Sequence, residues 1–273
     1  MRVTSDCLLC TGFFRSLLER NAHAEGLRRY AADMPTPTPG AKMLFLIKRR
    51  PATSREELVA HWFANHMPGV IETQTAQAAR GRNAARRYIA TLFDADKRGE
   101  HPWDGMAALW FDKPFRKPDT PYGTEPSDTF QQKAEPYVPW ATTEYVIRDP
   151  SLWLPAEPLT LNAPFPITRS GFYKVSFLIE AKPGTDFDAL FAHWLNVHVP
   201  NVKSTMEKAG GFGYAVSLSL KPETERYAGL AEVWYPDESG WRAYRDALEP
   251  DGIEAWVERA IVLKSHTEMV GIP

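Results

Sequence analysis

An internal repeat constrains this chain more than any other feature. When the sequence is shifted by 132 positions, residues 45–70 align with residues 177–202, and 12 of the 26 aligned residues are identical. Unrelated segments of this length would share roughly one or two identities, so the two segments are copies of one unit. The repeat contains the phrase HWFANHMPGV at 61–70 and HWLNVHVPNV at 193–202. We therefore expect two halves with the same order of elements.

The match continues with shorter offsets, as expected where loops differ in length. The further matched pairs are YIATL (88–92) with YAVSL (214–218), GMAALWF (105–111) with GLAEVWY (229–235), and TEYV (143–146) with TEMV (267–270). These runs are short, apolar and rich in β-formers, as are MLFLIK (43–48) and YKVSFLI (173–179), so each is predicted to be a strand.

Helices are predicted between these strands. Ser54 and Glu57 form a capping box, and Asp186 stands at the matching N-cap position of the second half. Residues 239–248 (SGWRAYRDAL) read as an amphipathic helix before the last strand. Each half therefore has the order β-α-β-β-α-β, which is the ferredoxin-like arrangement of an α+β fold.

A four-stranded antiparallel sheet with helices on one face leaves its other face bare. Two such halves can cover these faces by packing sheet to sheet, so we expect an intrachain pseudo-dimer, a dimeric α+β barrel within one chain. The expected organisation is an N-terminal extension and linker at 1–41, one repeat at 42–148, a Pro-rich linker at 149–171 and a second repeat at 172–273.

Composition excludes several classes of function. The chain of 273 residues has a formal net charge of −2, which gives no electrostatic reason to expect nucleic acid or an anionic membrane. Its apolar runs fall far short of the ~20 residues that span a bilayer. Cys7 and Cys10 are the only cysteines, and one isolated C-x-x-C pair is a weak metal or redox signal. Without other cysteines the body of the chain holds no disulfide, which fits the cytoplasm.

Helical geometry separates the two histidines of each repeated phrase. At about 100° per residue, His66 lies at the centre of the apolar stripe and His61 lies on the far side of the helix. His198 and His193 repeat this arrangement. Histidines five residues apart diverge, so they are not a helical chelating pair, and we predict no metal site.

His66 and His198 are therefore the candidates for chemistry. Pro68 and Pro200 predict that each helix ends close to its histidine. Burial disfavours the imidazolium and a helix C-terminus favours it, a balance that suits a general acid or base. The alternative is structural: each histidine donates one hydrogen bond and closes the end of its helix.

Aromatic residues recur at matched positions of the two halves. Core packing explains most of them, but a cavity for an apolar or aromatic ligand would use the same residues. The candidates for such a cavity are Trp62, Trp194, Trp110, Trp234, Tyr88 and Tyr214.

The pattern of strand, R-P, capped helix and W-x-x-x-H-x-P resembles the EthD-like family of the dimeric α+β barrel superfamily. It appears as IKRRPATSREELVAHWFANHMPGV and again as IEAKPGTDFDALFAHWLNVHVPNV. The resemblance covers residues from about 43 to 148 and 172 to 271 and implies the fold described above. It also implies a ligand cavity between helices and sheet, with His66 and His198 lining it. The usual member is one such domain that dimerises, so a further homodimer of this chain stays open.

The two halves differ at ionisable positions. Glu232 aligns with Ala108, and His266 aligns with Thr142, so the second half carries extra polar groups near its matched strands. The first half alone has the long segment DKPFRKPDTPYGTEPSD at 112–128. On these differences the second half is expected to be the better-equipped site, with Glu232 and His266 among its substrate-binding residues.

The leading functional hypothesis is a cofactor-free lyase, isomerase or cyclase that acts on a small apolar aromatic, lactone or polyketide-like metabolite, as in catabolism. His198 or His66 would move a proton at a carbon next to a carbonyl, Tyr214 or Tyr88 would stabilise the oxyanion, and the tryptophans would hold the ring. The resemblance leaves two alternatives. One is a haem- or oxygen-dependent oxidoreductase with a buried histidine as axial ligand. The other is a non-catalytic binding protein for a hydrophobic metabolite.

Overall fold

The computed structural model describes residues 35–95, 102–154 and 164–273. Within them, Thr36–Pro273 forms one compact unit. Most of the expected N-terminal extension, with Cys7 and Cys10, lies outside the described residues, as does 155–163 of the expected linker. We refer to residues 36–148 as the first half and to residues 167–273 as the second half. None of the described helices is both long and apolar enough to cross a membrane.

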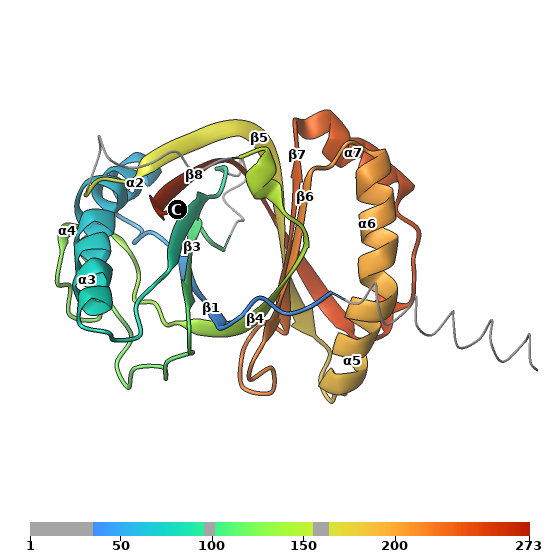
Figure 1. Cartoon of the computed structure of the whole chain (residues 1–273), viewed down its shortest axis with the longest axis horizontal. Helices are drawn as coiled ribbons and strands as arrows, with labels where there is room; N and C mark the ends of the chain where they lie inside the picture. Colours follow the sequence, from blue (N-terminus) through green and yellow to red (C-terminus); the bar gives the residue numbers. More distant parts are fainter. Residues whose placement is uncertain (1–34, 96–101, 155–163) are drawn as a thin grey trace, which may run out of the picture. The chain divides into compact units, whose positions relative to one another are not determined.

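Eight antiparallel strands form a closed barrel (Figure 1). The order around the barrel is β1-β3-β2-β8-β5-β7-β6-β4. The strands are β1 (Ala41–Ile47), β2 (Arg87–Leu92), β3 (Gly105–Phe111), β4 (Trp140–Arg148), β5 (Ile167–Ala181), β6 (Gly213–Ser219), β7 (Gly229–Tyr235) and β8 (Val257–Ile272). This mixed α+β architecture confirms the expected fold class at that level.

The two halves join through their strand edges as well as through their faces. β2 pairs with β8, and β4 pairs with β6, so that no strand of the barrel lacks a neighbour on either side. The expectation of one sheet packed on another is corrected in this respect, because the bare faces meet inside a continuous barrel. Edge pairing satisfies backbone N–H and C=O groups that two separate sheets would leave open.

Helices cover the outside of the barrel on two opposite sides, α2, α3 and α4 on one and α5, α6 and α7 on the other (Figure 1). Their bounds are α2 (Arg55–His61), α3 (Met67–Ala79), α4 (Thr129–Lys133), α5 (Phe187–His193), α6 (Val199–Lys208) and α7 (Glu238–Ala247). Short 3-10 turns lie at η2 (Pro150–Leu152) and η5 (Ile253–Ala255). The predicted caps are present, since Ser54 and Glu57 form the capping box of α2 and Asp186 caps α5.

The repeated W-x-x-x-H segment is a π-helical turn in both halves, η1 (Trp62–His66) and η4 (Trp194–His198). The prediction that the helices end at these histidines was wrong, because α3 and α6 continue the chain with helical geometry. Pro68 and Pro200 fall in the first turn of α3 and α6, where the missing N–H breaks no hydrogen bond. The π-turn therefore lets each proline remain inside a longer helical run.

Alternation along the strands divides the barrel wall into two faces. Met43 and Phe45 of β1 point to the helices, whereas Lys42 and Leu44 point into the barrel, as the core clusters on the two sides show. Because both faces are covered, all seven residues of β3 and all seven of β7 are buried. A Cβ on Gly105 would lie 2.8 Å from the Trp62 ring, so a side chain at this position would displace the tryptophan.

Candidate functional site

The predicted site residues fall on opposite faces of the barrel wall. Those on the helix side are His66, Trp62 and Tyr88 in the first half and His198, Trp194 and Tyr214 in the second. Those in the barrel interior are Trp110, Trp234 and Glu232. The wall of the barrel separates the two groups, so they do not form one site.

A cavity of about 330 Å³ lies between helices and sheet in the first half. We call it the first-half cavity. It is mostly apolar and aromatic, and its few polar side chains come from different elements. It is lined by Phe45, Ile47, Trp62, His66, Val70, Thr73, Gln74, Tyr88, Ala107, Leu109, Phe111, Phe115, Tyr122, Phe130, Gln131 and Tyr137. Three of the predicted residues, His66, Trp62 and Tyr88, are therefore brought together at one cavity.

His66 is held by a carboxylate that the sequence analysis did not identify. Its Nδ1 lies 2.6 Å from Oδ2 of Asp128, and its ring stacks on Phe130 with 4.5 Å between centroids. Asp128 is also the N-cap of α4, where Oδ1 accepts the backbone N–H of Gln131 at 2.8 Å. Burial alone would raise the pKa of Asp128, but the hydrogen bonds from His66 and Gln131 hold it below its ordinary value.

The ionised Asp128 sets the tautomer of the histidine. A carboxylate only accepts hydrogen bonds, so the Nδ1–H of His66 donates to it. In neutral His66 this leaves the lone pair on Nε2. A side chain held in this way can take a proton at Nε2 and return it, which is the requirement for a general base that lines a cavity.

Tyr88 lines the same cavity as this histidine, and a tryptophan holds its hydroxyl group. The Trp62 Nε1–H donates to the Tyr88 hydroxyl oxygen at 3.1 Å. Tyr88 is 1% exposed, and burial raises its pKa far above the ordinary value, although the bond from Trp62 opposes the shift. At neutral pH Tyr88 is therefore a phenol, able to donate its own hydrogen to a ligand.

The second half repeats the histidine–carboxylate pair. Nδ1 of His198 lies 2.8 Å from Oδ2 of Asp251, which also accepts from Asn201 Nδ2 at 2.8 Å. Burial raises the pKa of Asp251, but the contacts with Asn201 and His198 outweigh it and lower the value. The Trp194 Nε1 and Tyr214 hydroxyl atoms have no hydrogen-bond partner among the described residues.

Aromatic side chains of α7 occupy the space over the second-half sheet. Trp241 packs against Phe177 with ring centroids 5.6 Å apart, and against Tyr235 at 6.5 Å. Tyr244 lies 5.6 Å from Trp241 and 6.0 Å from Tyr235. Phe177 is the counterpart of Phe45, which instead lines the first-half cavity. The first-half cavity thus lies in the half that was not expected to be the better-equipped one.

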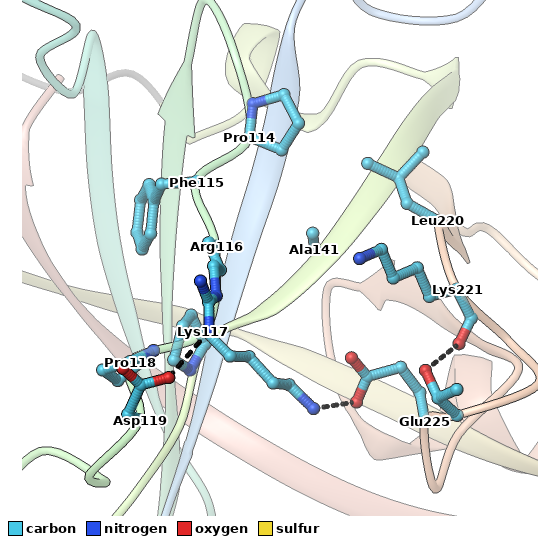
Figure 2. Close-up of a pocket in the computed structure, with 12 residues that line it drawn as sticks. Pro114, Phe115, Arg116, Lys117, Pro118, Asp119, Ala141, Leu220, Lys221 and Glu225 are labelled. Atoms are coloured by element: carbon cyan, nitrogen blue, oxygen red, sulfur yellow. Dashed lines mark hydrogen bonds and ion pairs between the residues drawn. The ribbon is translucent and has the colours of Figure 1, made fainter.

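The first half has a proline-rich segment where the second half has α7. Residues 112–128 contain Pro114, Pro118 and Pro121, and prolines at this spacing are incompatible with a continuous helix. A separate hollow of about 610 Å³ lies beside residues 114–119. Figure 2 shows Lys117 of its lining reaching across to Glu225. Lys117 Nζ lies 2.6 Å from Glu225 Oε2. This ion pair ties the segment to the loop that follows β6.

Glu232, Trp110 and Trp234 belong to a buried charged cluster inside the barrel and not to the first-half cavity. Lys42 bridges Glu144 at 2.9 Å and Glu232 at 2.6 Å, and Lys174 bridges Glu232 at 2.7 Å and Glu268 at 2.8 Å. The Trp110 Nε1–H donates to Glu144 at 2.7 Å, and Lys174 lies over the Trp234 ring at 4.6 Å. These groups pair with one another around a space of only about 50 Å³.

His266 also lies away from the first-half cavity. Its Nδ1 is 2.8 Å from Oδ2 of Asp94, and its side chain is 57% exposed. The ring meets Tyr173 edge-on at 4.9 Å. The alignment with Thr142 placed it near a strand but could not say which way the side chain points.

The side chains in the described part of the chain do not fit a metal ion or haem. Among the residues that the structure describes, no group of three or more His, Cys, Asp and Glu side chains could hold a metal ion. The volume of the first-half cavity is at the small end of the range for ligand pockets. Its described lining has no lysine or arginine to pair with haem propionates. The volume of the cavity instead suits a compound of one or two fused rings.

Comparisons with known proteins bear on the family. Residues 50–136 match the model of the EthD domain, a span that includes His66, Tyr88 and Asp128. A search of curated proteins found no match to the chain.

Solved structures resemble the fold only distantly. A heme-binding protein from Thermus thermophilus is 10% identical, with 86% of this chain and 94% of that chain covered and a TM-score of 0.41. An anthrone oxidase-like protein is 10% identical, with 85% and 94% covered and a TM-score of 0.46. A variant of chlorite dismutase from Candidatus Nitrospira defluvii is 9% identical, with 85% and 91% covered and a TM-score of 0.45. Likeness at this level does not assign a function. What the comparisons show is a match to the EthD domain over residues 50–136 of this chain.

Proposed function

We propose that the protein is a cofactor-free lyase, isomerase or cyclase whose working site is the first-half cavity. Its substrate would be a small, largely apolar aromatic, lactone or polyketide-like metabolite. The observation that carries the proposal is the pairing of His66 with Asp128 at 2.6 Å in the wall of an apolar cavity that also holds Tyr88. A base, a group that orients it and an O–H donor at one apolar cavity are the parts that proton transfer at carbon requires.

The elementary step is a proton transfer next to a carbonyl. Nε2 of His66 takes the proton, the electron pair of the broken C–H bond forms a C=C bond, and the carbonyl π electrons move to oxygen. Tyr88 donates its hydrogen bond to that oxyanion. Asp128 stabilises the imidazolium, which then returns the proton to the same or another atom. The enolate and the proton balance the step without an oxidant or reductant.

We assign the corresponding residues of the second half, His198 and Tyr214, a structural role. Trp241 and Tyr244 take the space that a substrate would need, and Asn201 engages the same oxygen of Asp251 as His198 does. In this proposal the structural alternative applies to the second half: His198 makes a hydrogen bond that supports its helix. Trp62 and Trp194 differ in the same way, because only Trp62 lines the described cavity.

We also propose that the chain is a tandem pair of ferredoxin-like repeats at 42–148 and 172–273, with 149–171 as linker and the second repeat as a diverged EthD copy. The strand neighbours support this division. β4-β1-β3-β2 and β8-β5-β7-β6 have the same internal order, and Lys42 and Lys174 occupy the same register opposite Trp110 and Trp234.

Exchange of deuterium from heavy water into a bicyclic ketone tests the proposed function, and it does not require the natural substrate to be known. In heavy water the wild-type protein should exchange the α-hydrogens of β-tetralone for deuterium. Mass spectrometry measures the exchange. His66→Asn should slow this exchange by about 10²–10⁴-fold, the usual contribution of one acid–base group. If wild type binds β-tetralone but exchanges no hydrogen above buffer, the catalytic proposal fails and a binding protein is indicated.

A further inference from the structure

A second phenol lies in the wall of the first-half cavity, and the proposed chemistry has not used it. Tyr137 follows α4 in the chain, whereas Tyr88 lies on β2. Both side chains line the cavity, and they are 9% and 1% exposed respectively. Each hydroxyl oxygen accepts a hydrogen bond from a protein N–H group: Tyr88 from Trp62 at 3.1 Å, and Tyr137 from Gln131 Nε2 at 3.3 Å.

The direction of the bond to Tyr137 is determined by its neighbours. The other end of the Gln131 amide, Oε1, accepts the backbone N–H of Ser127 at 2.8 Å and the Ser127 hydroxyl at 3.0 Å. A backbone N–H can only donate, so Oε1 must face Ser127 and the NH₂ group must face Tyr137. The bond from Trp62 is equally determined, because an indole nitrogen only donates.

Both phenols therefore keep their own hydrogen. A hydroxyl group has one hydrogen to donate in addition to its lone pairs. Within the described residues, neither the Tyr88 hydrogen nor the Tyr137 hydrogen has an acceptor. Leaving a buried donor unsatisfied costs free energy, so a ligand that supplies acceptors at this cavity would be favoured.

The phenols remain protonated at neutral pH. Burial raises the pKa of Tyr137 to about 12, and the negative charge of Asp128 adds to the increase while Gln131 opposes it. The charge of Asp128 acts on Tyr88 in the same direction. Burial therefore keeps both phenols as O–H donors, and the charge of the carboxylate that orients His66 adds to this effect.

We infer that Tyr137 is a second O–H donor of this site, and that the cavity selects ring compounds with two acceptor oxygens, such as cyclic β-diketones and their enolates. Tyr88 and Tyr137 would each donate to one oxygen. His66 would face the acidic carbon that both carbonyl groups activate. The inference rests on the proposed function for the role of His66, but the two donors are assigned from their own hydrogen bonds.

Calorimetric titration with three bicyclic ligands of similar shape tests the inference. Indanedione offers two oxygens, indanone one, and indane none. Wild type should bind indanedione most tightly and indane least tightly. Tyr137→Phe should weaken indanedione binding by about 10–100-fold, the range for a hydrogen bond to a charged acceptor, and leave indane binding unchanged. Tyr244→Phe, a buried phenol of the second half, serves as the matched control and should bind all three ligands as wild type does.

Each outcome decides the matter. Unchanged indanedione affinity in folded Tyr137→Phe protein would overturn the inference, and so would equal binding of indanone and indanedione by wild type. The ligand series in wild type needs no variant, so it decides even if Tyr137→Phe does not fold. Failure of β-tetralone exchange with an intact indanedione preference would remove the catalytic proposal and leave the two donors in place.

Discussion

The two halves of the barrel carry the same histidine and carboxylate but surround them differently. In the first half Phe45 borders an open cavity, whereas in the second its counterpart Phe177 packs against Trp241 of α7. The cause is local, since Pro114, Pro118 and Pro121 occur where α7 forms in the second half. In the proposed function, the shared motif positions the base, and the chain after the third strand of each half decides whether a ligand has room beside it.

The largest expected effect is a rate difference between matched histidine variants. His66→Asn should lower the exchange rate of β-tetralone by about 10²–10⁴-fold, and His198→Asn should leave it near that of wild type. The reason is that only His66 lines the described cavity. Exchange rates measured on both variants, with circular dichroism to confirm folding, check the difference. Equal losses in the two variants would break the comparison.

The buried charged cluster offers a second difference between the halves, because Glu232 stands where the first half has Ala108. Glu232→Gln should lower the free energy of unfolding by about 3–5 kcal/mol, since Lys42 and Lys174 each lose a buried partner. Asp119→Asn, which removes an exposed partner of Arg116, should change it by about 0–1 kcal/mol. Urea unfolding measures both changes in the free energy of unfolding. Similar changes in the two variants would show that the buried cluster does not contribute strongly to stability.

The same cluster predicts an acid dependence. Burial raises the pKa of Glu232, but Lys174 and Lys42 outweigh it and lower the value from 4.5 to about 2. Because the folded-state pKa is the lower one, the stabilisation from Glu232 is complete above the unfolded value and is lost as pH falls toward the folded value. As the pH falls from about 4.5 to about 2, the urea midpoint of wild type should therefore fall more steeply than that of Glu232→Gln. Parallel curves would contradict this assignment.

A smaller effect should distinguish the open half from the filled half. Ala107→Leu extends into the first-half cavity, so it should reduce ligand binding with little change in stability. Ala231→Leu, at the matched position of the second half, should lower the free energy of unfolding by about 1–3 kcal/mol through overpacking. Thermal unfolding and indanedione titration measure the two effects. If Ala107→Leu is the more destabilising variant, the first half is not open.

The smallest effect is expected where the halves agree. Ser54→Ala and Asp186→Ala each remove the N-cap of the first helix in their half, and each should cost about 1 kcal/mol. Chemical denaturation of both variants gives the values. Equal losses of unfolding free energy would show that the halves differ at their cavities and not in general stability. A much larger loss in one variant would indicate that the halves differ in stability as well.

Much of the fold could be predicted because the repeat, the strand patterns and the caps are local signals. Closure of the barrel could not, because pairing of β2 with β8 joins residues far apart in sequence. The π-turn at Trp62–His66 was also missed, since an α-helical period was assumed across Pro68.

The candidate site could be predicted only in part. His66, Trp62 and Tyr88 followed from the repeat, but Asp128 lies 62 residues from His66. A usable signal existed: Asp128 and Asp251 both stand before a short helical turn, 16 and 17 residues ahead of the matched Glu144 and Glu268. Tyr137 gave no such signal, because its role depends on a hydrogen bond from Gln131.

The most direct test of the central claim is the position of a bound ligand. Crystals soaked with a bromonaphthol would reveal the ring by the anomalous scattering of bromine. We expect a bromine peak in the first-half cavity, among Phe45, Tyr88 and Tyr137, and none over the second-half sheet. A peak beside His198 or Tyr214, with none beside His66, would contradict the assignment of the first-half cavity as the working site.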